Sequence, residues 1–544
     1  MAKTSGNDLV VKALKDEGVD TVFYLTGGPM VDVASRCIEI GFRSVDVRHE
    51  QAAAMAAHAY SRVRGKPGVC FAASGPGVTN LITGVGNAYL DAVPVVTLGG
   101  ASAISQAGMG AFQEMDQVSM FKPITKWAER VFDTRRIPEL INKAFRIATS
   151  GQPGPVYVDL PGDVLYKQVE ESEVVFPKKP HTVPRISGDP DLVKRAIALL
   201  KEAQRPIILT GTGILWSQAW DELREFVELT KIPFYTTPQG RGVIPEDHPL
   251  SFLGARNQAW KEADVVLLIG TRMNFIIGFG LPPRFAADVK FIQVDICDEE
   301  IGRNRPVEIG IVGDAKMVLQ QLIQEGRDVF HGRQELPWLE TLRGYDKRAQ
   351  EKSQALLNST AVPIHPLRLC KEVRDFMDRD AIIVVDGHEI LNFARQSIPT
   401  HVPGHRVNAG PNGCMGVAVP FGMGAKVAKP NTQVIVLSGD GSFGMNGMEI
   451  DTMVRHNIPV IIVISNNGGW AGAGVMNAGR DLGFSRYDKM AEVFGAHAEY
   501  VEQPQDIRPA LERAAASGKP AVINVITDPN ARSSTVPFAA YRAI

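Results

Sequence analysis

The residues best suited to chemistry lie in one stretch, Ser438–Trp470, where a carboxylate and an amide each follow an apolar run. Asp440 stands in Gly-Asp-Gly after the run Val434–Leu437, and Asn467 follows the run Val460–Ile464. Mg²⁺ takes carboxylate and amide oxygens from proteins and completes its octahedron with phosphate oxygens and water. The stretch therefore predicts a site for a divalent cation and a phosphate-bearing ligand.

The two apolar runs predict buried parallel strands joined by a helix over Asn446–Asn457, where apolar residues recur at helical spacing. Such a crossover is right-handed and returns the second strand beside the first or one strand away. Asp440 and Asn467 would then share the carboxyl edge of the sheet, where open α/β sheets bind ligands. The neighbouring glycines let an anion approach the backbone, and the helix offers its N-terminal amides. An ordinary strand–helix–strand unit with a loop aspartate is the alternative.

Composition bounds the class of protein. The chain has 544 residues, a net charge of −2, 44% hydrophobic and 22% charged residues, which fits a globular protein of several domains. Because the net charge is close to zero, the protein has no overall electrostatic attraction for nucleic acid or an anionic membrane, and neither partner is expected. The five cysteines lack metal-binding spacing and indicate free thiols in a reducing compartment, hence a cytoplasmic location. No apolar stretch approaches the ~20 residues of a membrane span, and the N-terminus lacks a signal-peptide core.

Three α/β blocks are expected, at residues 1–175, 191–330 and 360–544, the last with a C-terminal tail. Strands that alternate with helices predict parallel sheets wrapped by helices. The segment Pro177–Pro190 is expected to be a linker, and the charged helix Glu335–Leu356 a connection to the third block. The expected strands are Thr21–Leu25, Ser44–Val47, Gly68–Ala72, Val95–Leu98, Val156–Asp159, Pro206–Leu209, Val265–Ile269, Phe291–Val294, Ala381–Val385, Val434–Leu437, Val460–Ile464 and Ala521–Val525.

A second candidate for chemistry is Glu50, which opens an alanine-rich helix that continues toward Gly65. One interpretation is plain: the helix macrodipole favours an acidic residue in the first turn. The alanines support another, because small side chains allow close packing and predict a buried helix, at a subunit interface in one version of this hypothesis. A buried carboxylate keeps its proton or finds a specific partner.

The spacing from Gly-Asp-Gly at 439–441 to Asn-Asn at 466–467 resembles the signature of thiamine-diphosphate enzymes, and the segment HEQAA at 49–53 resembles their catalytic glutamate motif. The resemblance implies three doubly wound domains: pyrimidine-binding, central nucleotide-binding-like and diphosphate-binding. Asp440, Asn467 and the Gly469 carbonyl would bind Mg²⁺. Glu50 would hydrogen-bond the cofactor pyrimidine and promote the tautomer that deprotonates the thiazolium carbon.

In that superfamily the glutamate and the diphosphate anchor, about 390 residues apart here, meet across a dimer interface. The resemblance therefore implies at least a homodimer, with a homotetramer built as a dimer of dimers. The Gly413 carbonyl and the Met415 amide would grip the pyrimidine, and the Met415 side chain would bend the cofactor. A helix start packed against a neighbour is the alternative for this segment. The further implied cofactor contacts are Pro76, Asn80, Gly387, His388, Gly439, Gly441, Ser442 and Trp470.

Two further residues are expected to be catalytic, and each has a simpler interpretation. Gln113 resembles a family glutamine that faces the substrate, but a solvated loop amide fits its position equally. His388 would shuttle a proton, although loop histidines are commonly not catalytic. Trp470 either shapes the acyl pocket or is a packing aromatic. The tail Asp528–Ile544 is either a lid or a frayed terminus.

The middle block resembles oxalyl-CoA decarboxylases and 2-hydroxyacyl-CoA lyases, through the motifs GTRMN at 270–274, GFGLPPRF at 278–285, KFIQVDI at 290–296 and VGD at 312–314. That group binds ADP in this domain. The resemblance implies Arg272 on the phosphates, Asp295 on the ribose, Ile296 beside the adenine and Asp314 in the same site. Thr212 departs from the pattern, since oxalyl-CoA decarboxylases tend to carry lysine there, so ADP remains a possible rather than a required cofactor.

The function that the resemblance implies is a thiamine-diphosphate-dependent 2-hydroxyacyl-CoA lyase, which releases formyl-CoA and an aldehyde or ketone from an acyl-CoA substrate. An oxalyl-CoA decarboxylase and an acetohydroxyacid synthase-like carboligase that acts on pyruvate are the alternatives. A non-catalytic nucleotide sensor would predict a lost glutamate or a broken GDG–NN pair, and both are intact. Arg343, Lys347 and Arg348 either meet CoA phosphates or are a solvated helix face.

Overall fold

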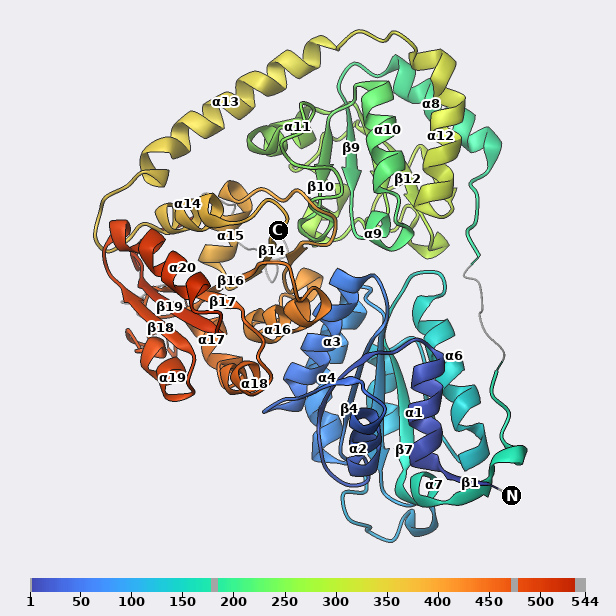
Figure 1. Ribbon diagram of the computed structural model, residues 1–544. Helices are drawn as coiled ribbons and strands as arrows, with labels where there is room; N and C mark the ends of the chain where they lie inside the picture. Colours follow the sequence, from blue (N-terminus) through green and yellow to red (C-terminus); the bar gives the residue numbers. More distant parts are fainter. Residues whose placement is uncertain (1, 178–183, 471–477, 534–544) are drawn as a thin grey trace.

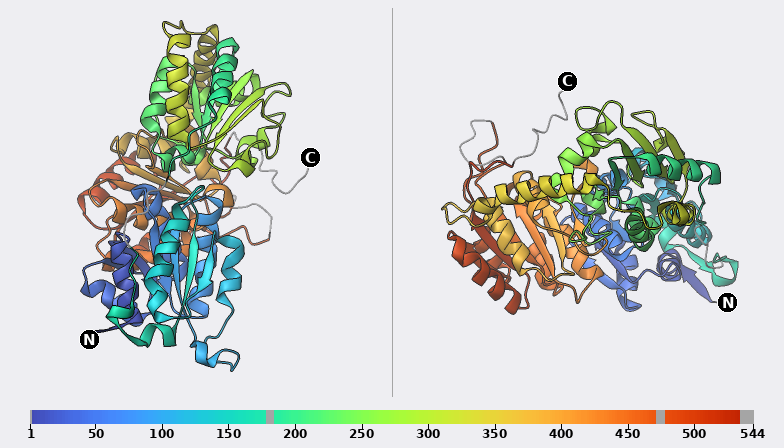
Figure 2. Two further views of the ribbon diagram at one scale, coloured as in Figure 1. Left: turned by 90° about the vertical axis from the view of Figure 1, so that its right-hand side faces the viewer. Right: turned by 90° about the horizontal axis from the view of Figure 1, so that it is seen from above.

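The computed structural model describes residues 2–177, 184–470 and 478–533 of the chain. The middle of the expected linker, the segment 471–477 after Trp470 and the tail from 534 onward lie outside these ranges. The described chain forms three α/β domains, each built on a parallel sheet (Figure 1). The first and third domains lie side by side and the central domain caps both, as the turned views in Figure 2 also show. The expected fold class is confirmed.

The first domain has a six-stranded parallel sheet in the order β3-β2-β4-β5-β7-β6. Its strands are β2 (Thr21–Leu25), β3 (Arg43–Asp46), β4 (Gly68–Ala72), β5 (Val95–Ala101), β6 (Ala128–Arg130) and β7 (Val156–Pro161). One face packs on α1 (Gly6–Asp16), α2 (Val31–Glu39) and α6 (Ile137–Thr149), and the other on α3 (Glu50–Arg64) and α4 (Pro76–Leu90). The short segments α5 (Gln117–Phe121), α7 (Gly162–Tyr166) and the antiparallel pair β1 (Lys3–Ser5) and β8 (Gln168–Glu170) complete it.

The central domain has a five-stranded parallel sheet in the order β10-β9-β11-β12-β13. Its strands are β9 (Pro206–Thr210), β10 (Phe234–Thr236), β11 (Val265–Ile269), β12 (Lys290–Asp295) and β13 (Ile309–Val312), covered by α8 (Pro190–Glu202), α9 (Gly213–Ser217), α10 (Trp220–Thr230), α11 (Arg256–Glu262) and α12 (Ala315–Phe330). The edge strands β10 and β13 were not expected from the sequence, because three and four residues give little periodic signal. The helix α13 (Pro337–Leu357) then runs to the third domain (Figure 1).

The third domain has a six-stranded parallel sheet in the order β15-β14-β16-β17-β19-β18. Its strands are β14 (Ile382–Asp386), β15 (Arg406–Val407), β16 (Val434–Gly439), β17 (Ile461–Asn466), β18 (His497–Val501) and β19 (Ala521–Ile526). Its helices are α14 (Pro366–Phe376), α15 (Glu389–Ser397), α16 (Ala418–Ala428), α17 (Asp440–Asn446), α18 (Glu449–Arg455), α19 (Tyr487–Val493) and α20 (Ile507–Ala516). The strands β16 and β17 are direct neighbours, so the crossover returns beside its starting strand.

The helix predicted over Asn446–Asn457 is wrong in its bounds. A first helix, α17, starts at Asp440 directly after the strand, and a second, α18, ends at Arg455. The apolar period that motivated the prediction begins only at Met448, since the preceding segment is rich in glycine and its buried apolar side chain, Phe443, gives no helical repeat by itself. The correction places Asp440 in the first turn of a helix instead of in a loop.

The alanine-rich helix α3 is buried, as its composition predicts, and it packs on α16 of the same chain. The contact requires small residues: a Cβ added at Gly424 would lie 2.2 Å from the Ala56 carbonyl oxygen. A Cβ at Gly84, on α4, would lie 2.6 Å from the Ala54 side chain. One apolar cluster therefore runs from the first sheet through these helices into the third sheet, and fixes the two domains against each other.

Candidate active site

Three polar groups meet at the carboxyl edge of the third sheet, where the sequence predicted a cation site. One end of the Asn467 side-chain amide lies 2.8 Å from the Gly469 carbonyl oxygen and 3.1 Å from Asp440 Oδ1. With the amide nitrogen at that end, both contacts are hydrogen bonds. With the amide oxygen there, three oxygens converge at the spacing of adjacent ligands in an octahedron of Mg²⁺, about 3 Å for bonds of about 2.1 Å.

The second carboxylate oxygen of Asp440 is available for a ligand. Asp440 Oδ2 is buried and has no hydrogen-bond partner among the described residues, although such atoms are nearly always paired. Burial raises the pKa of Asp440 to about 6, and nearby backbone N–H groups only partly oppose that shift. A cation would satisfy the orphaned oxygen and favour the ionised form, so the donor set fits Mg²⁺. In the described ranges no three His, Cys, Asp or Glu side chains form an alternative metal site.

The pocket beside this cation site is lined, in its described part, by residues of the third domain alone. The expected contacts Gly387, His388, Met415, Gly439, Gly441, Ser442, Asn467, Gly469 and Trp470 all line it. A Cβ at Gly441 would lie 2.8–2.9 Å from three carbons of the Trp470 indole. The indole thus lies directly on the glycine turn, which explains why this position carries no side chain.

Met415 lines this pocket and is held there by its neighbours. The Ser442 hydroxyl donates to Met415 Sδ at 3.6 Å, and the Asn446 amide donates to the Gly416 carbonyl at 2.7 Å. Gly413 ends a short turn with φ +62°, a left-handed conformation that favours glycine. Residues 413–416 are therefore fixed against α17, which also carries Asp440.

Asp386, at the end of β14, stabilises the loops at the carboxyl edge of the third sheet. Its Oδ1 accepts from the Gly387 N–H at 2.7 Å, and its Oδ2 accepts from the Ala418 N–H at 3.0 Å. Burial raises the pKa of Asp386 to about 6. The residue ties two pocket loops together and has no carboxylate oxygen free for a ligand.

Glu50 lies apart from this pocket within a single chain, in the first turn of α3. It is buried, and its Oε2 accepts from the Asn80 side-chain amide at 2.9 Å. Asn80 and Pro76 themselves are exposed, so the carboxyl lies just below a surface of the first domain. The structure therefore does not bring the two predicted halves of the site together in one chain.

Glu449 is a positioning residue that sequence reasoning missed. Its carboxylate accepts from the backbone N–H groups of Arg48 and His49 at 3.1 Å and from the Thr452 hydroxyl at 2.7 Å. Burial raises the pKa of Glu449. A residue of α18 thus fixes the turn that immediately precedes Glu50. Its place in a helix face gave no signal, because the partners lie about 400 residues away.

Gln113 lies beside the glycine loop of the first domain. Its side-chain oxygen accepts from the Ser74 hydroxyl at 2.6 Å, and its backbone has φ +59°. Gln117, which was not predicted, anchors the same region: it accepts from the Gly75 N–H at 2.7 Å and donates to Asp159 at 2.7 Å. The substrate-facing role of Gln113 stays a prediction.

His388 is the least fixed of the predicted catalytic residues. It precedes α15 with a side chain that is 55% exposed, and its Nδ1 lies 3.5 Å from a Glu389 carboxylate oxygen. That distance is too long for a positioned hydrogen bond. It lines the pocket, but its catalytic role stays a prediction.

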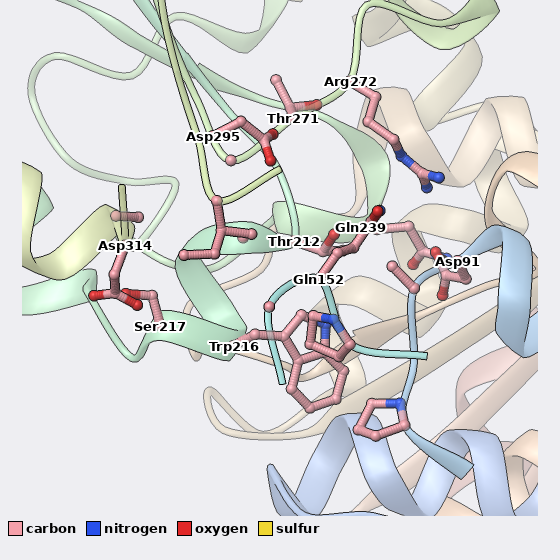
Figure 3. Close-up of a pocket in the computed structure, with 18 of the residues that line it drawn as sticks. Asp91, Gln152, Thr212, Trp216, Ser217, Gln239, Thr271, Arg272, Asp295 and Asp314 are labelled. Carbon is pink, nitrogen blue, oxygen red and sulfur yellow. Dashed lines mark hydrogen bonds between the residues drawn. The ribbon is translucent and has the colours of Figure 1, made fainter. Parts of the chain in front are cut away.

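A larger cavity, of about 330 Å³, lies at the carboxyl edge of the central sheet (Figure 3). The predicted nucleotide residues Arg272, Asp295, Ile296 and Asp314 all line it, as does Thr212. The first and third domains contribute walls as well, through the segments 65–67 and 151–153 and through Pro411. The cavity is therefore a junction of three domains.

The charged groups of this cavity differ in their availability. Asp314 caps α12, since it accepts from the Lys316 and Met317 N–H groups, the Ser217 hydroxyl and Arg185. Arg272 donates to the Leu90 carbonyl at 2.6 Å through one nitrogen, Nη2. Burial raises the pKa of Asp295 to about 6. Arg272 and Asp295 are thus the better placed of the predicted ligands, while Asp314 holds the wall.

These features define a class of protein: three α/β domains, with converging oxygen atoms at the carboxyl edge of the third sheet and a larger cavity at the carboxyl edge of the central sheet. The chain belongs to the thiamine pyrophosphate enzyme family. It matches the N-terminal binding domain of that family at residues 4–120, the central domain at 193–322 and the C-terminal binding domain at 390–525.

Relatives of known name cover nearly the whole chain. It is 37% identical over 536 residues to the acetolactate synthase large subunit of Mycobacterium tuberculosis, covering 96% of this chain and 95% of that protein. It is 33% identical over 558 residues to human 2-hydroxyacyl-CoA lyase 1, covering 98% and 96%. It is 35% identical over 543 residues to oxalyl-CoA decarboxylase of Escherichia coli, covering 97% and 96%. These identities show that the chain is a thiamine-pyrophosphate-dependent enzyme. They do not distinguish between the three activities that the relatives are named for.

The helices of the described ranges offer no candidate for a membrane span, since none combines the required length with the required apolar character. The five cysteines are free thiols, three of them buried.

Proposed function

We propose that the protein is a 2-hydroxyacyl-CoA lyase that uses thiamine diphosphate and Mg²⁺ to cleave an acyl-CoA substrate into formyl-CoA and an aldehyde or ketone. Oxalyl-CoA decarboxylation and pyruvate carboligation are the alternatives, because relatives that carry each name are similarly identical. The proposed domains are residues 1–175, 191–330 and 360–544, and free thiols support a cytoplasmic location.

The observation that carries the cofactor assignment is the convergence of Asp440, Asn467 and Gly469 at the strand edge. The orphaned Asp440 oxygen adds a further position for the cation. When bound, thiamine diphosphate supplies a nucleophilic carbon and stores the electrons released by carbon–carbon cleavage. The protein holds the diphosphate through the cation and the glycine turn at 439–441.

Glu50 is proposed to hold a proton toward the cofactor pyrimidine. The carboxyl is buried, and the Asn80 amide, which donates to its Oε2 at 2.9 Å, fixes its orientation. Met415, held by Ser442, is proposed to support the bent cofactor. Because Glu50 does not line the Asp440 pocket of its own chain, a second copy is proposed to present its Glu50 there. This supports a homodimer, and we extend it to a homotetramer as a proposal.

ADP is proposed for the cavity of the central domain, with Arg272 on the phosphates, Asp295 on the ribose and Ile296 along the base. The support is the placement of these residues around one cavity of about 330 Å³. Asp314 is proposed to act on this site only through the wall it holds.

The test is a product analysis. The protein, loaded with Mg²⁺ and thiamine diphosphate, is incubated separately with a 2-hydroxyacyl-CoA, oxalyl-CoA and pyruvate, and products are identified by mass spectrometry. The proposal expects formyl-CoA with a carbonyl product from the 2-hydroxyacyl-CoA, and loss of that product in Glu50→Gln. Formyl-CoA from oxalyl-CoA alone would select the decarboxylase, and acetolactate from pyruvate alone would select the carboligase. Either outcome would overturn the lyase.

A further inference from the structure

The carboxylate of Glu449, on α18 of the third domain, binds the turn that leads into α3 of the first. Glu449 is 1% exposed, and its Oε1 accepts from the Arg48 and His49 N–H groups at 3.1 Å each. Its Oε2 accepts from the Arg48 N–H at 3.1 Å and from the Thr452 hydroxyl at 2.7 Å. His49 is the N-cap of α3, and Glu50 is its first residue. Glu449 therefore holds the two residues that directly precede the proposed catalytic acid.

These bonds begin where the sheet of the first domain ends. Strand β3 ends at Asp46, and the Val47 N–H still donates to the Tyr24 carbonyl of β2 at 2.9 Å. The next two N–H groups along the chain donate to Glu449 instead. A single carboxylate thus replaces the sheet as the support of this turn, and hydrogen bonds to a charged acceptor are of the stronger kind.

A second contact ties α3 to the helix that carries Asp440. Asn446, the last residue of α17, donates to the Gly416 carbonyl at 2.7 Å and to Met55 Sδ of α3 at 3.8 Å. Because α17 begins at Asp440 and α3 begins at Glu50, the two acids belong to helices that are fixed against each other within one chain. Glu50 nonetheless does not line the pocket beside Asp440. The contacts of one chain therefore position both helices without bringing the two acids into one site.

The ion pairs at the rim of the same interface are of a different kind. Asp46 accepts from Arg455 Nη1 at 2.7 Å and lies 2.7 Å from His456 Nε2. The side chains of Arg455 and Asp46 are 35% and 40% exposed, so water and salt screen their attraction. These pairs hold the end of β3 and not the turn beside Glu50. Arg455→Gln, on the same helix as Glu449, is therefore a matched control.

We propose that Glu449 is a positioning residue that acts across the dimer: it orients Glu50 for the partner's catalytic site, and it does not serve the site built on Asp440 of its own chain. The inference rests on the proposed function, in which a second copy presents its Glu50 at the Asp440 pocket. Sequence alone would assign Glu449 to its own pocket, since it follows Asp440 closely, but its hydrogen bonds assign it to Glu50. A misplacement of about 1 Å can cost roughly 10²-fold in rate, so loss of these bonds should slow catalysis without weakening cofactor binding.

The first measurement needs no activity. Hydrogen exchange of the backbone amides in this turn is followed by mass spectrometry, in the full-length protein loaded with Mg²⁺ and thiamine diphosphate. Glu449→Ala is expected to speed exchange at Arg48 and His49 by about tenfold, since bonds to a charged acceptor are lost, and to leave Val47 unchanged. Glu449→Gln keeps an acceptor oxygen, so it and the control Arg455→Gln are expected to stay close to wild type. Unchanged exchange at both amides in Glu449→Ala would overturn the positioning role.

The second measurement identifies the site that Glu449 serves. Its readout is the exchange of the thiazolium carbon's proton of bound thiamine diphosphate into D₂O, followed by NMR, which requires no substrate. Dimers of Glu449→Ala are expected to exchange more slowly than wild type by roughly 10–100-fold. Mixed dimers of one Asp440→Ala chain and one Glu449→Ala chain are isolated through two affinity tags. They keep one site with an intact Asp440 from one chain and an intact Glu50 turn from the other, so that site is expected to exchange at the wild-type rate.

The outcomes separate this inference from the proposed function. Wild-type exchange in the Glu449→Ala dimer, or a mixed dimer as slow as that dimer, would overturn the inference. Asp440→Ala paired with Glu50→Gln, prepared in the same way, also keeps one intact site if two copies share their sites. Slow exchange in this pair would overturn the shared site, and the inference with it. Fast exchange in this pair with slow exchange in the Glu449 pair would count against the role of Glu449 alone.

Discussion

The third and central domains present the same edge of the same kind of sheet, yet only the central edge has a cationic side chain, Arg272, among its predicted ligands. At the third sheet, Asp440, Asn467 and Gly469 turn oxygens toward one point. At the central sheet, Arg272 faces the cavity and the acidic Asp314 is already used as a helix cap. In the proposed assignment both edges bind an anionic ligand, the third through a recruited cation and the central one through the guanidinium group of Arg272.

The difference teaches how one architecture serves two tasks. An edge that depends on a metal ion can bind a diphosphate only when the ion is present, and it places a concentrated charge beside the reacting atoms. An edge with arginine binds phosphate directly and places no metal there. Chemistry is therefore expected at the third domain, and nucleotide binding without chemistry at the central one.

The largest effect is expected from Asp440→Ala. The change removes the carboxylate on which the cation depends, so thiamine diphosphate should no longer be retained and activity should fall below detection. Bound cofactor is quantified by chromatography after gel filtration. Asp506→Ala, which removes an exposed aspartate before α20, should retain the cofactor as wild type does. If Asp440→Ala retained thiamine diphosphate fully, the third domain would not depend on a cation held by Asp440, and the proposed difference between the two sheet edges would be wrong.

Glu50→Gln is expected to lower kcat by about 10²–10⁴-fold, the usual contribution of a general acid–base group. The glutamine keeps the hydrogen bond with Asn80 but cannot transfer a proton, so calorimetric affinity for thiamine diphosphate should change little. Glu39→Gln, at an exposed ion pair with Arg36, is the control. A variant with normal kcat would show that Glu50 serves only as an acidic residue in the first turn of its helix.

Acid is expected to release the cofactor from the third domain selectively. The pKa of Asp440 is raised to about 6, so below that pH the carboxyl is protonated and competes with the cation. Apparent affinity for Mg²⁺ with thiamine diphosphate should then fall by up to about tenfold per pH unit below pH 6, and be constant above it. Calorimetry between pH 5 and 8 checks this (about one unit below to two above that pKa). A flat profile would contradict the assignment of Asp440.

Arg272→Gln is expected to weaken ADP by about tenfold, since one charge-assisted contact to phosphate is lost. Asp314→Ala should instead cost about 1 kcal/mol of stability through the lost cap and leave ADP affinity nearly unchanged. Lys290→Gln, at the opposite end of the same sheet, should alter neither. Calorimetry with ADP measures the affinity, and thermal unfolding measures the stability. An Asp314→Ala variant that no longer binds ADP would show that Asp314 is itself a ligand, contrary to this prediction.

Much of the fold could be predicted because buried parallel strands are continuous apolar runs, as β4 and β11 show. The edge residues Asp440 and Asn467 could be placed together for the same reason, since each follows such a run. The bounds of α17 could not be predicted, because its glycines interrupt the helical repeat of apolar residues on which such a prediction depends. The positioning role of Glu449 could not be predicted either, since its partners Arg48 and His49 lie about 400 residues away in the chain.

The central claim is that the third domain needs a cation to bind its anion and the central domain does not. Calorimetric titration of the protein with thiamine diphosphate and with ADP, each in Mg²⁺ and in excess chelator, tests it directly. The account predicts that chelation abolishes binding of thiamine diphosphate and preserves that of ADP. Thiamine diphosphate binding that survives chelation, or ADP binding that is lost with it, would contradict the account.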